Sequence, residues 1–276
     1  MQTLEPKRAS SPFAAEEAAA VRIARLAGAI LRERFCQTHQ ISLKGKVDLV
    51  TEADLASEAL IREELSREFP QDAVLGEEAG GASSSQAGRV WIFDPLDGTT
   101  NYAHRLPIFS VSIALCVDGV PRAGAVYNPV SDELFSAAER GGARRCQRGT
   151  ENPLQVTSHD RLEESLLVTG FPYRIRECVD DILAPLREMM LRSRGVRRLG
   201  SASLDLAYVA GGIFDAFWEI GLKPWDIAAG TIILREAGGV ITDYAGGALR
   251  LDGEEMVASN GRLHADLVAI LRRFQT

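Results

Sequence analysis

Cysteine and histidine are scarce in this chain of 276 residues. The four cysteines form no CxxC pair and no cysteine–histidine spacing typical of zinc sites, so neither a zinc site nor a disulfide framework is indicated. The four histidines lie in unrelated places, which disfavours catalysis through a histidine or cysteine nucleophile. These residues are Cys36, Cys116, Cys146 and Cys178, and His39, His104, His159 and His264.

Long apolar runs and an excess of positive charge are also lacking. No apolar run approaches the length of a membrane span, and the start, MQTLEPKRASSPFAAEE, has no long apolar core or cleavage-like site. The net charge is −7, and no basic stripe is interleaved with aromatics, so we expect no direct contact with nucleic acid. With 46% hydrophobic and 25% charged residues, the composition suits a globular protein, and we expect it to be cytoplasmic.

The order of helical and strand patterns predicts an α+β protein. Residues 1–14 mix proline, serine and charge and suggest a loose leader. We expect residues 15–276 to form one domain, with an α+β part over about 15–150 and an α/β part over about 151–276. Apolar periodicity and turn signals predict helices over 16–35, 51–69, 180–192, 200–211 and 224–237, strands over 72–76, 91–94, 166–170, 196–199, 213–220, 240–243 and 256–259, and three antiparallel strands between 108 and 138. Ser259 or Asn260 should cap a last helix.

The segment Trp91–Tyr102, WIFDPLDGTTNY, is the stretch around which we expect the chain to be organised. Its apolar start predicts a buried strand, which Pro95 should end because proline cannot donate to a sheet ladder. Gly98 permits a tight turn, and Thr99 or Thr100 could cap a short helix. Two carboxylates would then face a helix N-terminus, which suits Mg²⁺ beside a phosphate group.

The segment is also open to two other interpretations. It could be an ordinary turn, since aspartate and glycine are common turn residues. It also resembles the end of the DxDGT motif of haloacid-dehalogenase phosphatases, but Pro95 occupies the position of the nucleophilic aspartate. Covalent catalysis from this loop is therefore disfavoured.

Further acids occur at the ends of other predicted elements. Asp54 stands at capping-box spacing after Thr51, Glu77 follows the strand over 72–76, and Asp226 falls in the first turn after Pro224. An acid in a first helical turn can serve the helix dipole alone. Acids brought together without basic partners in their motifs would repel one another, however, unless a divalent cation joined them.

Four motifs, taken together, resemble the inositol monophosphatase family, a group of Mg²⁺-dependent, lithium-sensitive phosphatases. The resemblance covers roughly Glu16 to Leu271, with the motifs in the family's order: KGKVDLVTEAD, GEE, DPLDGT and WDIAAG followed by EAGG. It implies a layered αβαβα sandwich of the inositol monophosphatase and fructose-1,6-bisphosphatase type. It also implies hydrolysis of a small phosphate monoester by direct attack of a metal-activated water.

By the same resemblance, two Mg²⁺ ions are expected, with a third held weakly by Glu77 through water. Glu77, Asp94 and the Leu96 carbonyl would hold the first ion, and Asp94, Asp97 and Asp226 the second. Thr99, assisted by Asp54, would orient the attacking water, with Glu77 also in the catalytic set, and the N–H groups of Gly98 and Thr99 would hold phosphate oxygens. Lys44 would add positive charge, and the role of Glu78 stays open.

The resemblance also implies where the rest of the substrate binds. Its hydroxyls would meet Asp97, Glu219, Asp226 and the turn Gly200-Ser201-Ala202, which favours a polyol such as myo-inositol 1-phosphate. Fructose 1,6-bisphosphate, histidinol phosphate and a nucleotide 3′-phosphate remain open as substrates. A homodimer is implied, as is an additional protein-binding role in transcription complexes. The LLVTGFPY segment at 166–173 is expected to pack in the core, and Arg144, Arg145 and Arg148 to form a solvated surface.

Overall fold

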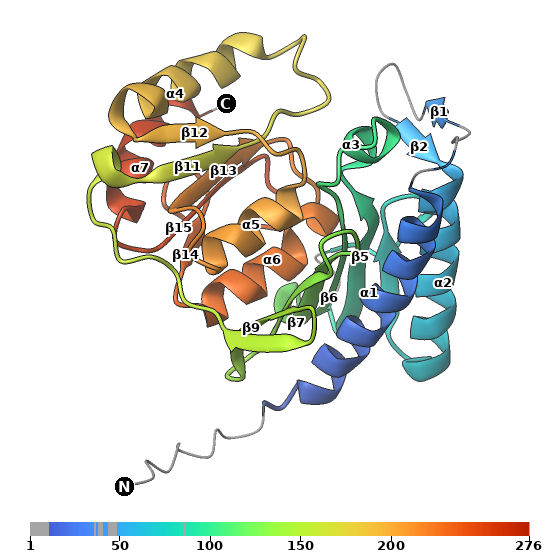
Figure 1. Cartoon of the computed structure of the whole chain (residues 1–276). Helices are drawn as coiled ribbons and strands as arrows, with labels where there is room; N and C mark the ends of the chain where they lie inside the picture. Colours follow the sequence, from blue (N-terminus) through green and yellow to red (C-terminus); the bar gives the residue numbers. More distant parts are fainter. Residues whose placement is uncertain (1–10, 36, 38–40, 44–48, 85–86, 276) are drawn as a thin grey trace, which may run out of the picture.

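Five layers of helices and sheets make up the structure, a computed structural model that describes residues 11–35, 37, 41–43, 49–84 and 87–275 (Figure 1). The helices are α1 Ala14–Arg34, α2 Glu52–Glu68, α3 Thr99–Ala103, α4 Val179–Arg192, α5 Ala202–Ala210, α6 Pro224–Glu236 and α7 His264–Leu271, with 3₁₀ turns at Leu162–Glu164 and Arg272–Phe274. The strands are β1 Ile41–Leu43, β2 Leu49–Thr51, β3 Ala73–Gly76, β4 Gly80–Gly81, β5 Arg89–Asp97, β6 Ser110–Val117, β7 Val120–Asn128, β8 Glu133–Ala138, β9 Gly142–Gln147, β10 Thr150–Pro153, β11 Leu166–Thr169, β12 Gly195–Arg197, β13 Ala216–Ile220, β14 Val240–Thr242 and β15 Glu255–Ser259.

Two sheets lie face to face across a helical layer. The larger sheet has the order β10-β9-β8-β7-β6-β5-β3-β4, and its pairs are antiparallel except β3 with β5. The smaller sheet has the order β12-β11-β13-β15-β14, with β11 parallel to both β12 and β13. Each sheet buries apolar side chains on both faces, so helices are needed on either side.

Three apolar cores hold the layers together. Helices α1 and α2 cover the outer face of the larger sheet, where Ile23 and Leu31 pack with Trp91 and Phe93. Helices α5 and α6 fill the space between the sheets, and α4 and α7 cover the outer face of the smaller one. This αβαβα order confirms the fold class expected from the sequence.

The start of α2 follows the sequence-based expectation closely. The Thr51 side chain accepts from the Ala53 N–H, and the Asp54 carboxylate accepts from the Thr51 N–H, which completes a capping box. The acid is fully buried, unlike an ordinary capping acid on a helix surface. This end of α2 therefore lies inside the molecule, close to the end of β5.

The predictions for the end of β5 and for the cap of α7 were wrong. Strand β5 continues to Asp97 instead of stopping at Pro95, although its pairing with β6 is irregular between Asp94 and Asp97, where Pro95 offers no N–H. Helix α7 begins at His264 without a side-chain cap, because the Asn260 side chain accepts from the Leu263 N–H in the turn before it.

The arginines of β9 also differ from expectation. Arg144 and Arg145 are half-buried and pair with the buried carboxylates of Glu17 and Glu133. Only Arg148 of the three is exposed. Burial of the two acids thus explains why basic residues occur in a strand that packs on the core.

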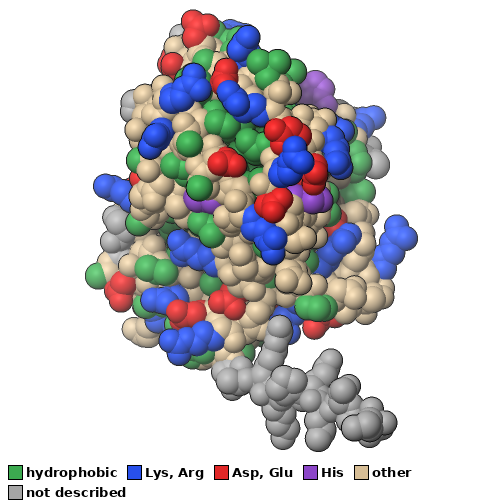
Figure 2. Space-filling view, turned by 90° about the vertical axis from the view of Figure 1, so that its left-hand side faces the viewer, with side chains coloured by type: hydrophobic (Ala, Val, Ile, Leu, Met, Phe, Trp, Pro, Cys, Tyr) green, Lys and Arg blue, Asp and Glu red, His purple; other side chains and the backbone are tan. Residues whose placement is uncertain are grey.

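Charged side chains of both signs are interspersed on the face shown in Figure 2. Within the described ranges, no helix combines the length and the apolar character needed to cross a membrane.

Candidate active site

An irregularity in β5 brings Asp94 and Asp97 to the same side of the larger sheet. Residues three apart in a regular strand point to opposite faces. Here the register shifts between the two aspartates, and oxygen atoms of both lie within 4.8 Å of each other and of an Asp226 oxygen. The sheet defect therefore assembles a cluster that a regular strand would separate.

Asp226 reaches this cluster from the first turn of α6. Pro224 starts the helix, where its missing N–H costs no hydrogen bond, and the Asp226 carboxylate accepts from the Lys223 N–H at 2.7 Å. Because α6 lies between the two sheets, its N-terminus meets the end of β5.

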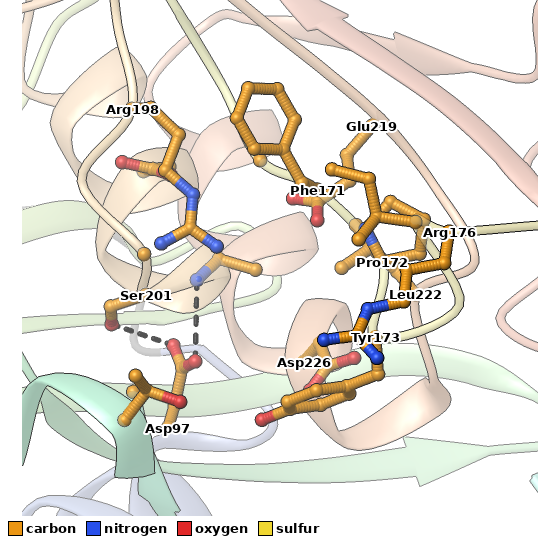
Figure 3. A pocket seen from close by; sticks show the side chains of 17 residues that line it. Asp97, Phe171, Pro172, Tyr173, Arg176, Arg198, Ser201, Glu219, Leu222 and Asp226 are labelled. Carbon is orange, nitrogen blue, oxygen red and sulfur yellow. Dashed lines mark hydrogen bonds between the residues drawn. The ribbon is translucent and has the colours of Figure 1, made fainter. Parts of the chain in front are cut away.

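Asp97 is held by the start of α5. Its carboxylate accepts hydrogen bonds from the Ser201 hydroxyl at 2.7 Å and from the Ser203 N–H and hydroxyl at 2.8 and 2.6 Å. The Ala202 N–H donates at 3.3 Å (Figure 3). These bonds join residues more than 100 positions apart and fix the carboxylate toward the cavity between the two sheets.

The electrostatics of the cluster favour a bound cation. Burial, together with the neighbouring acids, raises the pKa of Asp94 and Asp226 well above its usual range. Burial also raises the pKa of Asp97, against the lowering effect of its serine donors. Among the described residues, no lysine or arginine forms an ion pair with any of the three. Clustered carboxylate oxygens without a basic partner are the ligands that Mg²⁺ prefers, so this set fits a divalent cation.

Glu77 lies beside this cluster rather than within it. It lines the same cavity as Asp94 and Asp226, and its charge contributes to their raised pKa values. The loop that carries it is held by buried Glu58 of α2, whose carboxylate accepts from the N–H groups of Glu78 and Ala79 at 2.9 and 3.0 Å. The backbone at Glu78 therefore anchors the loop.

Asp54 and Thr99 are joined by a hydrogen bond close to the same place. The Thr99 hydroxyl lies 3.2 Å from an Asp54 oxygen and 3.0 Å from the carbonyl of Leu96. The sequence suggested that Thr99 or Thr100 caps α3. This is wrong, because Gly98 is the N-cap residue, with a φ of 95°. A β-carbon at Gly98 would also come within 3.1 Å of two carbonyl oxygens, so glycine is required there.

Two adjoining cavities open over these groups. One, of about 200 Å³, is lined by Glu77, Asp94, Leu96 and Thr99; the other, of about 360 Å³, is lined by Gly200, Ser201 and Ala202. Asp97, Gly98, Glu219 and Asp226 line both cavities. Among the described residues to which the sequence gave a role in the site, only Asp54 does not line a cavity, and it lies one hydrogen bond behind Thr99.

Glu219 enters the cavity from the end of β13. Its side chain is buried against Gly170, where a β-carbon would come within 2.0 Å of the carboxylate. Burial raises the pKa of Glu219 to about 8, while nearby Arg198 lowers it and Asp97 raises it. Glu219 is therefore a carboxyl group kept away from water and facing the space above the cluster.

Sequence reasoning missed one wall of the cavity. Gly170, Phe171, Pro172 and Tyr173 line it (Figure 3), although Phe171 also packs against a core cluster, as expected for this segment. Arg176, Arg198 and Asp205 line the larger cavity too. No motif marks them, because their proximity arises only when the segment after β11 folds over the start of α5. Lys44 and Asp48 lie outside the described residues.

Comparison with known proteins agrees with this geometry. Residues 15–276 match the sequence profile of the inositol monophosphatase family. The inositol-1-monophosphatase of Synechocystis is 43% identical over 242 residues, which cover 87% of this chain and 83% of that protein. Escherichia coli Nus factor SuhB is 38% identical, with coverage of 92% and 94%. The solved inositol monophosphatase of Anabaena superposes with a TM-score of 0.83 at 41% identity, covering 94% of this chain and 96% of that one.

Proposed function

This chain belongs to the inositol monophosphatase family and is a phosphoric monoester hydrolase; we propose that it uses Mg²⁺ to hydrolyse a small polyol phosphate, with myo-inositol 1-phosphate as the first candidate. The observation that carries the proposal is the cluster of Asp94, Asp97 and Asp226, whose oxygens lie within 4.8 Å and face a cavity.

The proposed ligands divide between two ions. Glu77, Asp94 and the Leu96 carbonyl would hold one, and Asp94, Asp97 and Asp226 the other, with a third ion weakly held near Glu77. Bound Mg²⁺ would neutralise charge on the phosphoryl group and the leaving oxygen and lower the pKa of a water molecule. The metal-dependence of the family and the acidic cluster support this assignment.

The protein's own groups would position the reactants. The hydroxyl of Thr99, hydrogen-bonded to Asp54, would orient the attacking water, and Asp54 would accept its proton through that hydroxyl. The N–H groups of Gly98 and Thr99 would donate to phosphate oxygens. The water oxygen forms a bond to phosphorus as the ester bond breaks, and the released alcohol takes up a proton.

A polyol is favoured by the rest of the cavity. Glu219 and the turn Gly200-Ser201-Ala202 lie beyond the acidic cluster and offer a carboxylate, a hydroxyl and backbone groups to substrate hydroxyls. Fructose 1,6-bisphosphate, histidinol phosphate and a nucleotide 3′-phosphate remain alternatives with the same metal chemistry.

Purified protein should release phosphate from myo-inositol 1-phosphate only when Mg²⁺ is present, and lithium should inhibit it. A panel of kcat/KM values for the alternative substrates would rank them. Turnover that survives complete chelation of divalent ions would overturn the metal assignment. A higher kcat/KM for one of the alternatives would replace the substrate.

A protein-binding role is a second candidate, because one relative is a Nus factor. Affinity capture with an inactive variant should recover transcription proteins if this role exists, whereas capture equal to that of an unrelated acidic protein would argue against it. The family resemblance also favours a homodimer, which a mass measurement in solution would test.

A further inference from the structure

Asp205 is a buried acid that the proposed mechanism does not use. It lies in the first turn of α5 and is 1% exposed. Within the described part of the chain, neither of its carboxylate oxygens accepts a hydrogen bond. Such a group normally costs free energy, because the water it loses on folding is not replaced.

The position of Asp205 at the start of a helix does not explain why its carboxyl group is buried without a hydrogen bond. The N–H groups of Ala202 and Ser203, which an acid at this end could accept from, already donate to Asp97. The matched case is Asp215, which is 3% exposed and accepts from the Thr157 hydroxyl and the Leu166 N–H. The fold itself supplies hydrogen-bond donors to the Asp215 carboxylate, whereas it supplies none to that of Asp205 among the described residues.

The surroundings of Asp205 point to the cavity. It lines the larger cavity together with Glu219 and Arg198. Burial raises its pKa well above the usual range, the charges of Glu219 and Asp97 raise it further, and Arg198 lowers it. Two carboxyl groups and one guanidinium therefore meet on the wall that lies beyond the metal cluster.

We propose that Asp205 is a specificity-determining residue that accepts a hydrogen bond from a substrate hydroxyl remote from the phosphate, beside the hydroxyl bound by Glu219. This inference rests on the proposed function. A neutral donor suits the wall, because two acids would repel a second anionic group and Arg198 already supplies a positive charge. A polyol offers such donors on adjacent carbons.

The test compares two substrates that differ in hydroxyl groups. Turnover of myo-inositol 1-phosphate and of phenyl phosphate, which has none, would be measured for the parent protein, Asp205→Asn and Asp205→Ala. We expect kcat/KM for the inositol ester to fall about tenfold to a hundredfold in Asp205→Ala, less in Asp205→Asn, and that for phenyl phosphate to change less than about threefold. The melting temperature of Asp205→Asn should stay close to that of the parent, because the substitution breaks no hydrogen bond within the described part of the fold.

Asp215→Asn is the matched control. It should lower the melting temperature and leave the ratio of the two kcat/KM values unchanged, because it breaks bonds within the fold. Equal losses on both substrates, or no loss on either, in the Asp205 variants would overturn this inference while leaving the metal chemistry standing. Failure of the parent protein to hydrolyse either substrate with Mg²⁺ would instead overturn the proposed function, and this inference with it.

Discussion

Two groups of acids near the larger sheet differ in how their charge is balanced. Glu17 and Glu133, near β8 and β9, each pair with an arginine. Asp94 and Asp97, at the end of β5, have no such partner among the described residues and crowd against Asp226. Arginines pair with the first group, whereas we propose that the second group binds a cation, so only the second should respond to added metal.

The largest expected effect is on activity at the unpaired cluster. Asp94→Asn should lower kcat by about 10³-fold, because a ligand proposed to serve both ions is lost. Its melting temperature in chelator should not fall, since mutual repulsion is relieved. Steady-state kinetics and thermal unfolding would measure both, and retention of more than a tenth of the parent kcat would remove Asp94 from the site.

Glu58 shares a feature with each group, because it pairs with an arginine and also supports the site. Its substitution should therefore have an intermediate effect on activity. Glu58 pairs with Arg62 but also holds the loop of Glu77 through two N–H groups. Glu58→Gln should raise the Mg²⁺ concentration needed for half-maximal activity by about tenfold to a hundredfold, as loss of a ligand's supporting partner does. Titration of activity with Mg²⁺ measures this.

Glu17→Gln is the control for that experiment, because neither Glu17 nor its partner Arg144 lines either cavity of the site. It should lower stability and leave the Mg²⁺ requirement as it is. An equal shift in both variants would mean that Glu58 acts only through general stability.

Metal should stabilise the fold through the unpaired cluster alone. At Mg²⁺ concentrations about a hundred times the dissociation constant, the expected gain is about 2.7 kcal/mol. Differential scanning calorimetry with and without Mg²⁺ would show it as a higher melting temperature. The gain should largely disappear in Asp97→Asn and persist in Glu17→Gln; the same gain in Asp97→Asn would contradict the assignment of that ligand.

A further expected effect is a pH dependence of stability in the absence of metal. The pKa of Glu219 is raised from 4.5 to about 8, so the folded state binds a proton more tightly than the unfolded chain. Its contribution to stability is complete below pH 4.5 and is lost as the pH rises to 8, by at most about 1.4 kcal/mol per pH unit. Melting temperatures in chelator should fall over this range, and less steeply in Glu219→Gln; a rise would refute the direction.

The sequence was informative where chemistry is local. Asp94, Asp97 and Asp226 could be singled out because each lies in a short motif at the end of an element, and the structure brings their oxygens together. The layered fold followed from the order of helices and strands and from the family resemblance.

What the sequence did not reveal depends on contacts between distant segments. Asp205 looks like any acid in a first helical turn until its donors are seen to be taken by Asp97. Glu58 looks like a surface residue of an amphipathic helix until the loop after β3 folds onto it. The wall at Phe171 was assigned to the core, because an apolar side chain beside a buried strand gives no sign that a cavity lies next to it.

Pro95 limits how regular the larger sheet can become. A residue with an N–H at this position could extend the ladder between β5 and β6 and make the strand more robust to heat. The same repair would restore the two-residue alternation and turn one aspartate away from its neighbour. Substitutions of Pro95 that raise thermal stability should therefore lower the rate of hydrolysis. The proline keeps the sheet irregular at the point where the chemistry needs both aspartates on one side.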